Sequence, residues 1–430
     1  MRKCARAKDT TRRSSDNTLV PVTYDLYDVC DVRLAGHMNT PFNRITLIVL
    51  DGAGIGAMPD ASEWGDSGAD TLGHICESRQ LRLPNLRSLG LGNIRPLAGL
   101  PPLENVRGCY GKCALRSNGK DTTTGHWEMA GIILERAFPT YSNGFPQSVI
   151  DQFVARSHVP GILGNIPASG TEIIKQLGDE HVKTSKPIVY TSADSVFQIA
   201  AHEEIIPLER LYEICEIARD LLRGEHEVGR VIARPFLGKP GSFFRTENRH
   251  DYAVPPPREN LLPVLSANGL DVVAIGKIAS IYDSTGVTQD VSAKNNEQSI
   301  NQTIRALEQQ TRGLVFSNLV DFDMLYGHRR DTEGYARALE HFDSRWPEIE
   351  TVMRNDDLVI ITADHGNDPT YPGTDHTREY APLLVFGKVA KAGINLGSRR
   401  SLADIGKTIA ENFGLSLDSG ESFLDEIVLV

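Results

Sequence analysis

The sequence predicts an α/β fold, with a mostly parallel sheet flanked by helices and an inserted α+β segment. Three short apolar runs, rich in β-branched residues, predict buried parallel strands. They cover residues 44–51, 313–323 and 357–364, and each ends in an acidic residue. In open α/β sheets the carboxyl ends of such strands line the ligand crevice, so these acids are the first candidates for a functional site.

Length and charge limit the class of protein. The 430 residues exceed the size at which single hydrophobic cores usually split, so two domains are expected. A formal net charge of −11 argues against nonspecific nucleic-acid binding. It does not exclude anionic substrates, because bound divalent cations would invert the local field. No apolar run approaches the ~20 residues that span a bilayer, so no membrane partner is expected. Nothing indicates an obligatory protein partner.

The first 43 residues differ from the rest of the chain. They carry basic residues and show neither a helical nor a strand period, so residues 1–43 are predicted to form a disordered extension. Met38 is interpreted as the working start, with a charged regulatory arm as the alternative. Without an apolar segment a secretory signal is not expected. The six scattered cysteines, with no CxxC pair, are typical of reduced thiols and favour a cytoplasmic location.

The first part of the chain alternates strands, tight turns and helices. The strand that ends at Asp51 enters a glycine turn at residues 52–56, and a helix is expected around residues 71–77. A second helix is predicted from about Asn85, because a proline stands near its start and a glycine at its end. The glycine- and threonine-rich run at residues 119–125 then opens a further helix, expected at residues 126–134.

The texture changes between residues 137 and 253. This stretch mixes two helical segments with two short strands, at residues 148–157, 208–223, 187–191 and 229–234. It ends in a loop rich in proline and charge, after which a strand at 270–276 and a helix at 296–310 resume the earlier pattern. We therefore expect a catalytic core of residues 44–136 and 254–430, with residues 137–253 inserted as a cap.

Six acidic and histidine residues near the strand ends predict a metal centre. They are Asp51, Asp323, His328, Asp364, His365 and His376. Carboxylates and imidazoles suit manganese, zinc or magnesium. An aspartate after a strand is often only a helix N-cap, so each residue alone is weak evidence. Together the six suffice for two ions and are too many for one tetrahedral site. Paired metals typically clamp a phosphoryl group.

Three consecutive threonines are candidates for the nucleophile. Thr122, Thr123 and Thr124 stand at an expected helix N-terminus, where backbone N–H groups and the helix dipole favour an anion. Coordination to a divalent cation can activate a threonine hydroxyl. The alternative is an ordinary N-cap with polar neighbours. The spacing does not decide which threonine reacts.

Five segments carry a resemblance to a known family. Residues 51–61, 119–128, 190–196, 318–323 and 363–369 look like the motifs of bacterial phosphopentomutases, also called phosphodeoxyribomutases. That family belongs to the alkaline-phosphatase superfamily, so the resemblance implies an alkaline-phosphatase-like core. The similarity runs from about Arg44 to the C-terminus. One departure is the first loop, which reads Asp-Gly where many relatives have Asp-Ser, and it leaves Asp51 intact.

The resemblance assigns roles to the metal ligands and to one threonine. Thr122 matches the phosphorylated residue. One manganese site is matched by Asp323, His328 and His376, and the other by Asp51, Asp364 and His365 together with Thr122.

The resemblance also implies how the sugar phosphate is bound. The positions that match substrate-binding residues are Ser192, Asp194, Arg230 and Ile232, and Lys277 could also reach the substrate. A carboxylate such as Asp194 can bind ribose hydroxyls, and arginines such as Arg230 and Arg245 can hold the phosphate that is not transferred. The alternative for each arginine is a solvated surface charge.

The function implied is the interconversion of α-D-ribose 1-phosphate and D-ribose 5-phosphate, and of the 2-deoxyribose pair. It would run through a phosphothreonine and a 1,5-bisphosphate. Two divalent cations, Mn²⁺ before others, would be cofactors, and glucose 1,6-bisphosphate or ribose 1,5-bisphosphate would activate the enzyme. One rival is a cofactor-independent phosphoglycerate mutase, although such enzymes use a serine where this chain has Asp121-Thr122-Thr123. Further rivals are a metal-dependent phosphomonoesterase and a non-catalytic metal-binding protein.

Overall fold

The computed structural model describes residues 40–192, 194–256, 259–309 and 311–429. The prediction of a disordered extension therefore falls, apart from its last four residues, outside the described residues, as does Met38. Those last four residues include Phe42, which is fully buried and whose backbone N–H donates to Asn412 Oδ1 at 3.0 Å.

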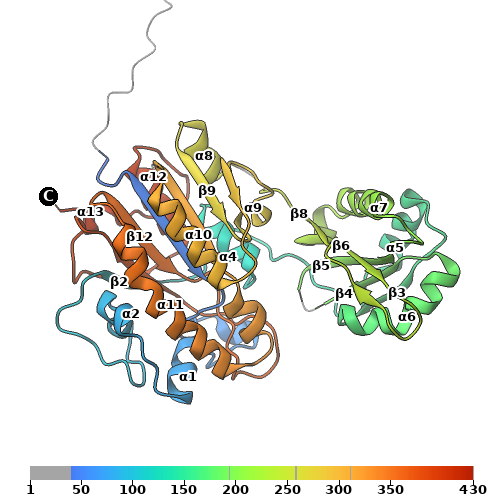
Figure 1. The fold of residues 1–430 in the computed structure, drawn as a ribbon, viewed down its shortest axis with the longest axis horizontal. Helices are drawn as coiled ribbons and strands as arrows, with labels where there is room; N and C mark the ends of the chain where they lie inside the picture. Colours follow the sequence, from blue (N-terminus) through green and yellow to red (C-terminus); the bar gives the residue numbers. More distant parts are fainter. Residues whose placement is uncertain (1–39, 193, 257–258, 310, 430) are drawn as a thin grey trace, which may run out of the picture. The chain divides into compact units, whose positions relative to one another are not determined.

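An eight-stranded sheet forms the centre of the core (Figure 1), in the order β10-β9-β11-β1-β12-β13-β2-β14. Its strands are β1 (Arg44–Leu50), β2 (Cys109–Cys113), β9 (Asp271–Ile275), β10 (Gln289–Val291), β11 (Gly313–Leu319), β12 (Asp357–Thr362), β13 (Ala381–Phe386) and β14 (Asn395–Arg399). Neighbouring strands pair in parallel except where β13 pairs with β12 and β2. The predicted fold class, a mostly parallel sheet flanked by helices, is confirmed.

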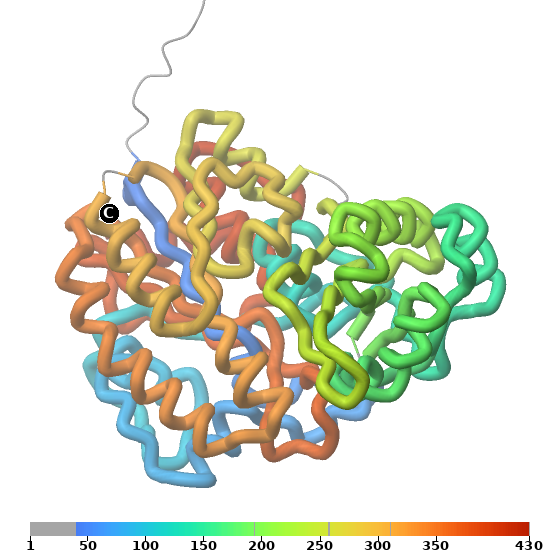
Figure 2. Tube along the Cα trace, turned by 45° about the vertical axis from the view of Figure 1, so that its right-hand side comes forward, coloured from blue at the N-terminus to red at the C-terminus, as the bar shows by residue number. Residues whose placement is uncertain are grey.

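The three predicted strands lie next to one another. β1 (blue in Figure 2) lies between β11 and β12, two segments more than 260 residues further along the chain. Leu50 pairs with Leu319 and Val49 with Thr362, so the three strands end at the same edge of the sheet. Every residue of the three strands is buried, as expected for strands covered by helices on both faces.

Helices surround this sheet in two groups. One group packs together from α1 (Thr71–Ser78), α2 (Pro84–Leu89), α10 (Asn296–Glu308) and α11 (Thr332–Val352). The other contains α4 (Thr122–Met129), α8 (Leu261–Ala267) and α12 (Ala403–Asn412). Short helices complete the core: α3 (Leu91–Ile94), α9 (Ile278–Ile281), α13 (Leu424–Ile427) and the 3₁₀ turn Ala61–Trp64.

Two expected elements differ in their bounds. The second apolar run, residues 313–323, does not remain a strand to Asp323, because β11 ends at Leu319 and a π-helix, Phe322–Gly327, follows it. Asp323 therefore lies in this π-helix and not at the end of the strand. Helix α4 ends at Met129 and does not continue to residue 134, since Gly131 adopts a positive φ of 92° that terminates the helix.

A second, six-stranded sheet is formed within residues 137–253. Its strands are β3 (Leu163–Pro167), β4 (Ile188–Thr191), β5 (Val196–His202), β6 (Arg230–Leu237), β7 (Phe244–Arg245) and β8 (His250–Ala253). Three helices accompany them, α5 (Gln147–Ser157), α6 (Gly170–Thr184) and α7 (Leu208–Leu221), with the 3₁₀ turn Gly224–His226. Alternate strand residues pack into two separate hydrophobic clusters, one with α5 and α7 and one with α6. The sheet therefore has its own core on each face.

Two negative features bear on the class of protein. No helix in the described ranges is both long and apolar enough to cross a membrane. Four of the six cysteines lie in the described ranges, and all four are buried without a disulfide: Cys76, Cys109, Cys113 and Cys215.

A buried ion pair joins the starting ends of β1 and β12. Arg44 donates from Nε to Oδ1 of Asp357 at 3.0 Å and from Nη2 to Oδ2, and neither side chain is exposed. Nη1 of Arg44 donates to the carbonyls of Leu307 at 2.8 Å and Gln309 at 3.0 Å, at the end of α10. The pair therefore connects two central strands to a covering helix, at the edge of the sheet opposite the acidic residues.

Replacing Arg44 by methionine should destabilise the fold strongly, because it removes the buried guanidinium that makes two hydrogen bonds to Asp357 and leaves this carboxylate, among the described residues, only its contacts with Arg354. We expect a loss of about 3–5 kcal/mol in the free energy of unfolding, measured by urea denaturation. The matched control is Arg156→Met, which removes an exposed ion pair with Asp220 and should cost less than about 1 kcal/mol. Equal losses in the two variants would show that the buried pair has no special weight.

Candidate active site

The first group of predicted ligands surrounds the hydroxyl of Thr122. Asp51 follows β1, whereas Asp364 and His365 follow β12, and their ligand atoms lie within 4.8 Å of one another. His365 Nε2 lies 3.4 Å from Asp51 Oδ1 and 3.3 Å from Asp364 Oδ2. Thr122 Oγ1 lies 3.2 Å from the same Nε2 and 3.5 Å from Asp51 Oδ1. These four side chains therefore form one compact group at the start of α4.

The second group lies beside the first and depends on the π-helix after β11. A π-turn hydrogen bond joins the His328 N–H to the Asp323 carbonyl at 3.0 Å, which places residues five apart on one side of the helix. As a result, His328 Nε2 lies 3.3 Å from Asp323 Oδ2, and His376 Nε2 lies 3.4 Å from Asp323 Oδ1. The rings of His365 and His376 are tilted by 58° with their centroids 4.3 Å apart, so the two groups adjoin.

Backbone carbonyls orient two of the imidazoles. Nδ1 of His365 lies 3.0 Å from the Gly366 carbonyl, and Nδ1 of His328 lies 2.7 Å from the Thr374 carbonyl. Each bond places a proton on Nδ1, so Nε2, which faces the carboxylates, can bind a metal ion once it loses its own proton. This is the arrangement in which histidine binds a metal ion.

Charges in this site perturb one another strongly. Burial and the neighbouring Asp364 raise the pKa of Asp51. Burial acts in the same direction on Asp323, but His376 and His328 outweigh it and hold the pKa of Asp323 well below its usual range. For His365, burial disfavours the charged form, yet Asp364 and Asp51 raise its pKa well above the ordinary value. So much buried negative charge is stable only beside cations.

The side chains present fit divalent metal ions. Asp364 Oδ2 is buried and has no hydrogen-bond partner among the described residues, although its other oxygen accepts the Gly52 N–H at 3.0 Å. Carboxylate oxygens beside imidazole Nε2 atoms that can lose their protons are a donor set suited to manganese, zinc or magnesium. Both groups could therefore hold an ion each, as the sequence predicts.

Two buried residues that the sequence analysis did not assign lie behind the carboxylates. Asn318, the next-to-last residue of β11, donates from Nδ2 to Asp51 Oδ2 at 3.0 Å and lies 3.3 Å from His126 Nε2. On α4, His126 Nδ1 lies 2.9 Å from the Thr122 carbonyl and 3.1 Å from Asp364 Oδ2. Both residues are fully buried, so Asn318 and His126 link the two carboxylates to helix α4, which begins at Thr122.

Close backbone contacts place Thr122. Gly125 packs so tightly on the backbone of Asp364 that a Cβ at this position would lie 2.1 Å from the Asp364 carbonyl oxygen. The loop before α4 is held by the buried Arg378, whose guanidinium donates to the carbonyls of Leu115, Ser117 and Gly119 at 2.7–2.8 Å. Of the three threonines, Thr122 has its hydroxyl within hydrogen-bonding distance of the predicted metal ligand His365. The hydroxyl of Thr124 donates instead to Asp121, the N-cap residue of α4.

A cavity of about 650 Å³ extends from Thr122 to the second sheet. All five predicted substrate-binding residues line it, together with Arg245: Ser192, Asp194, Arg230, Ile232 and Lys277. Its volume is that of a site for a small ligand. The structure thus brings these residues together around one space, and their individual roles stay predictions.

Four arginines from β6, from β7 and from the residue before β8 give the cavity a positive wall. They are Arg230, Arg234, Arg245 and Arg249. The sequence did not predict a role for Arg234 or Arg249, and the two differ in their partners. Arg249 forms a bidentate ion pair with Asp251. Within the described part of the chain, Arg234 donates a hydrogen bond only to the side-chain amide oxygen of Gln198, at 3.0 Å. Burial and Arg249 lower the pKa of Arg234 to about 10, so it keeps its charge near neutral pH. An incompletely neutralised guanidinium cluster is a site for a phosphate.

The N-terminus of α6 adjoins these arginines. A Cβ on Gly170 would lie 1.9 Å from Arg245 Nη2 and 2.3 Å from the Tyr190 hydroxyl, so only glycine permits this approach. The Tyr190 hydroxyl is buried and has no hydrogen-bond partner in the described part of the chain. A free hydroxyl, a guanidinium and a helix N-terminus can together bind an anion.

Comparisons with known proteins agree with this chemistry. A family model described as the metalloenzyme superfamily matches residues 43–417. A phosphopentomutase from Caldanaerobacter subterraneus subsp. tengcongensis is 56% identical over 90% of this chain and 98% of that protein. Phosphopentomutases from Desulfitobacterium hafniense and Symbiobacterium thermophilum are each 57% identical, over 90% and 89% of this chain and 100% and 98% of theirs. A solved phosphoglycerate mutase from Leishmania mexicana reaches a TM-score of only 0.46 at 14% identity, covering 92% of this chain and 99% of that one. A TM-score below 0.5 at this identity does not establish a shared function.

Metal affinity should rise with pH. Burial disfavours the charged imidazole of His328, but the Asp323 carboxylate outweighs it and raises the pKa of His328 to about 9. A cation must therefore displace a proton from this ring at any pH below about 9. We expect the apparent Mn²⁺ affinity to increase roughly tenfold per pH unit for each displaced proton between pH 6.5 and 8.5. Calorimetric titrations in buffers of different ionisation enthalpy measure both the affinity and the protons released, and a flat profile would contradict this view.

The Nδ1 proton of His126 should be necessary for strong metal binding. In His126→Asn the amide nitrogen can replace Nδ1 and still donate to the Thr122 carbonyl, whereas in His126→Gln it cannot. We expect the glutamine variant to bind Mn²⁺ about 10–100-fold more weakly and the asparagine variant to stay near the wild type. Calorimetry of the metal-depleted variants measures this difference. Equal weakening in both would assign the effect to lost packing against Phe316.

Proposed function

This chain belongs to the phosphopentomutase family within the metalloenzyme superfamily, and from that premise we propose how its own residues carry out the reaction. It is an isomerase that moves a phosphoryl group within a pentose phosphate. The substrates would be α-D-ribose 1-phosphate and D-ribose 5-phosphate, with the 2-deoxyribose pair.

The position of the Thr122 hydroxyl carries this proposal. It lies at the N-terminus of α4, against Asp51 and His365 on one side and open to the arginine-lined cavity on the other. A phosphoryl group on this oxygen would face both the metal ligands and the bound sugar. Backbone N–H groups at the helix start favour the negative charge of that group.

The transfer would take place in two steps. In the first, the free hydroxyl of a pentose monophosphate attacks the phosphorus of phospho-Thr122, the bond to Oγ1 breaks, and a 1,5-bisphosphate forms. In the second, Oγ1 attacks the other phosphate of the bisphosphate, which restores phospho-Thr122 and releases the isomeric monophosphate. A sugar bisphosphate such as glucose 1,6-bisphosphate or ribose 1,5-bisphosphate would supply the first phosphoryl group.

Two divalent cations, most suitably Mn²⁺, would occupy the two ligand groups. Asp51, Asp364 and His365, with Thr122, would hold one ion. Asp323, His328 and His376 would hold the other. When bound, the ions neutralise charge on the transferred phosphoryl group and lower the pKa of the attacking hydroxyl.

The cavity wall would bind the rest of the sugar phosphate. Arg230, Arg245 and Lys277 would hold the phosphate that is not transferred, while Ser192 and Asp194 would bind sugar hydroxyls. Ile232 is buried and would pack against the sugar. Arg234 adds a further guanidinium to the phosphate site. Because the bisphosphate must present each end to Thr122 in turn, binding groups that fit either phosphate are an advantage.

The domain division stays a proposal that the two separate sheets support. Residues 44–136 and 254–430 would form the catalytic core, and residues 137–253 would form a cap that excludes water from the phosphoenzyme. The buried, unpaired cysteines favour the cytoplasm as its location. We expect pentose phosphates as partners, with no nucleic acid and no obligatory partner protein.

Thr122→Ala should abolish isomerisation because it removes the oxygen that carries the phosphoryl group. Thr123→Ala is the matched control and should keep most of the activity. The assay follows ribose 5-phosphate formation from ribose 1-phosphate with Mn²⁺ and a trace of glucose 1,6-bisphosphate, and free phosphate is monitored in parallel. We expect Thr122→Ala to lose at least about a thousandfold in rate, as for removal of a catalytic nucleophile.

The same assay distinguishes the rival activities. Phosphate release without isomerisation would indicate a phosphomonoesterase on the same metal core. If neither product forms, the next substrate to test is a phosphoglycerate. Full turnover by Thr122→Ala would contradict the phosphothreonine mechanism while leaving the family assignment intact.

A further inference from the structure

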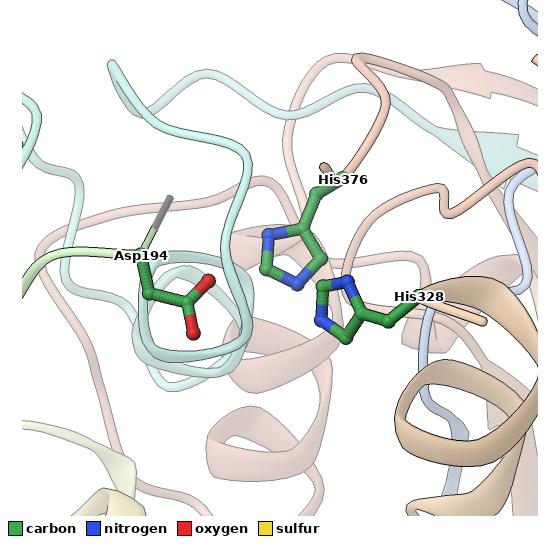
Figure 3. A group of neighbouring side chains, drawn as sticks. All are labelled: Asp194, His328 and His376. Atoms are coloured by element: carbon green, nitrogen blue, oxygen red, sulfur yellow. The ribbon is translucent and has the colours of Figure 1, made fainter. Parts of the chain in front are cut away.

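A carboxylate of the cap lies against two imidazoles of the core. Asp194, from the loop between β4 and β5, faces His328 and His376 (Figure 3). One ligand atom from each of the three lies within 4.8 Å of the others, which is close enough for all three to contact a single ion. The sequence analysis placed Asp194 with the sugar and did not connect it to the metal ligands.

Arg230 does not account for the position of this carboxylate. Its guanidinium approaches Asp194 Oδ2 only to 3.7 Å, which is longer than a hydrogen bond. The same guanidinium lies 3.6 Å from Asp251, a second carboxylate that already pairs with Arg249 at 2.6 Å. No hydrogen bond to the Asp194 carboxylate occurs within the described ranges, so its oxygens are available to a cation.

We propose that Asp194 is an additional protein ligand of the cation held by Asp323, His328 and His376 when no sugar phosphate fills the cavity. This inference rests on the two-cation centre proposed above. The three core residues supply three ligands, whereas manganese commonly takes six. The ion would therefore need further ligands, and Asp194 has a carboxylate oxygen within 4.8 Å of ligand atoms of His328 and His376.

These further ligand positions would also suit the oxygens of a sugar phosphate. Carboxylate, phosphate and hydroxyl oxygens are similar ligands for such an ion, so the substrate and Asp194 compete for one place. With the cavity empty, the Asp194 contact holds the cap against the core and keeps water from phospho-Thr122. With a sugar bound, the displaced carboxylate is free to accept a hydrogen bond from a sugar hydroxyl.

Mn²⁺ binding in the absence of substrate tests this role. Asp194→Asn is nearly isosteric, changes a partly exposed side chain and removes the negative charge that an ion prefers. The matched control is Asp251→Asn, which removes a carboxylate from the same cavity wall. Asp251 belongs to none of the candidate metal-binding clusters among the described residues. Isothermal titration of the metal-depleted, full-length proteins resolves the two binding steps, and circular dichroism confirms folding.

We expect Asp194→Asn to weaken one of the two steps about tenfold and to leave the other unchanged. Asp251→Asn should leave both steps within about twofold of the wild type. If Asp194→Asn binds both ions like the wild type, or if the two variants weaken binding equally, Asp194 is not a ligand. If the wild type itself does not bind two ions, the metal centre proposed above fails, and that result is distinct from a failure of Asp194 alone.

Discussion

Buried negative charge is the constraint on which this structure depends. Three parallel strands bring the carboxylates of Asp51, Asp323 and Asp364 to one edge of the sheet, out of contact with water. An unpaired buried carboxylate costs several kcal/mol, so each needs partners on every side. Among the described residues, Asn318 donates to Asp51, Asn367 donates to Asp323, and the Gly52 N–H donates to Asp364. The Thr122 hydroxyl also lies 3.5 Å from Asp51. The remaining carboxylate oxygens face imidazole rings, and they are therefore available to bind metal cations.

The nucleophile's position depends on those same carboxylates. Helix α4 approaches β12 closely at Gly125, and His126 then bridges Thr122 and Asp364. A shift of the carboxylate would therefore move the helix start that carries the hydroxyl. Because α4 is only eight residues long, its intrinsic stability is small, and its place is set by these tertiary contacts. Metal binding and nucleophile placement are in this way parts of one arrangement.

The sequence predicted the centre of this fold because local pattern determines it. Apolar runs that end in acids gave β1, β11 and β12, and the predicted ligands do meet at their ends. What it could not give depends on non-local pairing. The spacing of Asp323 and His328 brings both to one side only through a π-helix, which has no simple sequence signature. Arg234 and Arg249 reach the cavity through the antiparallel pairing of β6 and β8. Taken alone, His126 has no feature in the sequence that distinguishes it from other helix residues, although its side chain contacts the Thr122 carbonyl. The feature of the sequence that could have indicated a role for His126 was its position in the same motif as Thr122, four residues later.

The cavity joins two charged regions of opposite kind, and this explains why it suits a phosphorylated sugar. Its core end consists of carboxylates that require cations, and its cap end consists of arginines that require anions. A pentose phosphate can meet both demands, since in the proposed reaction its phosphate would lie at the arginines while an oxygen at its other end would approach the ions. Asp194 is a cap residue that belongs by charge to the core end. A carboxylate at this place serves the enzyme when no substrate is bound, because it supplies the negative ligand that the substrate later replaces. It also makes the contact between cap and core depend on the same ions that take part in the phosphoryl transfer.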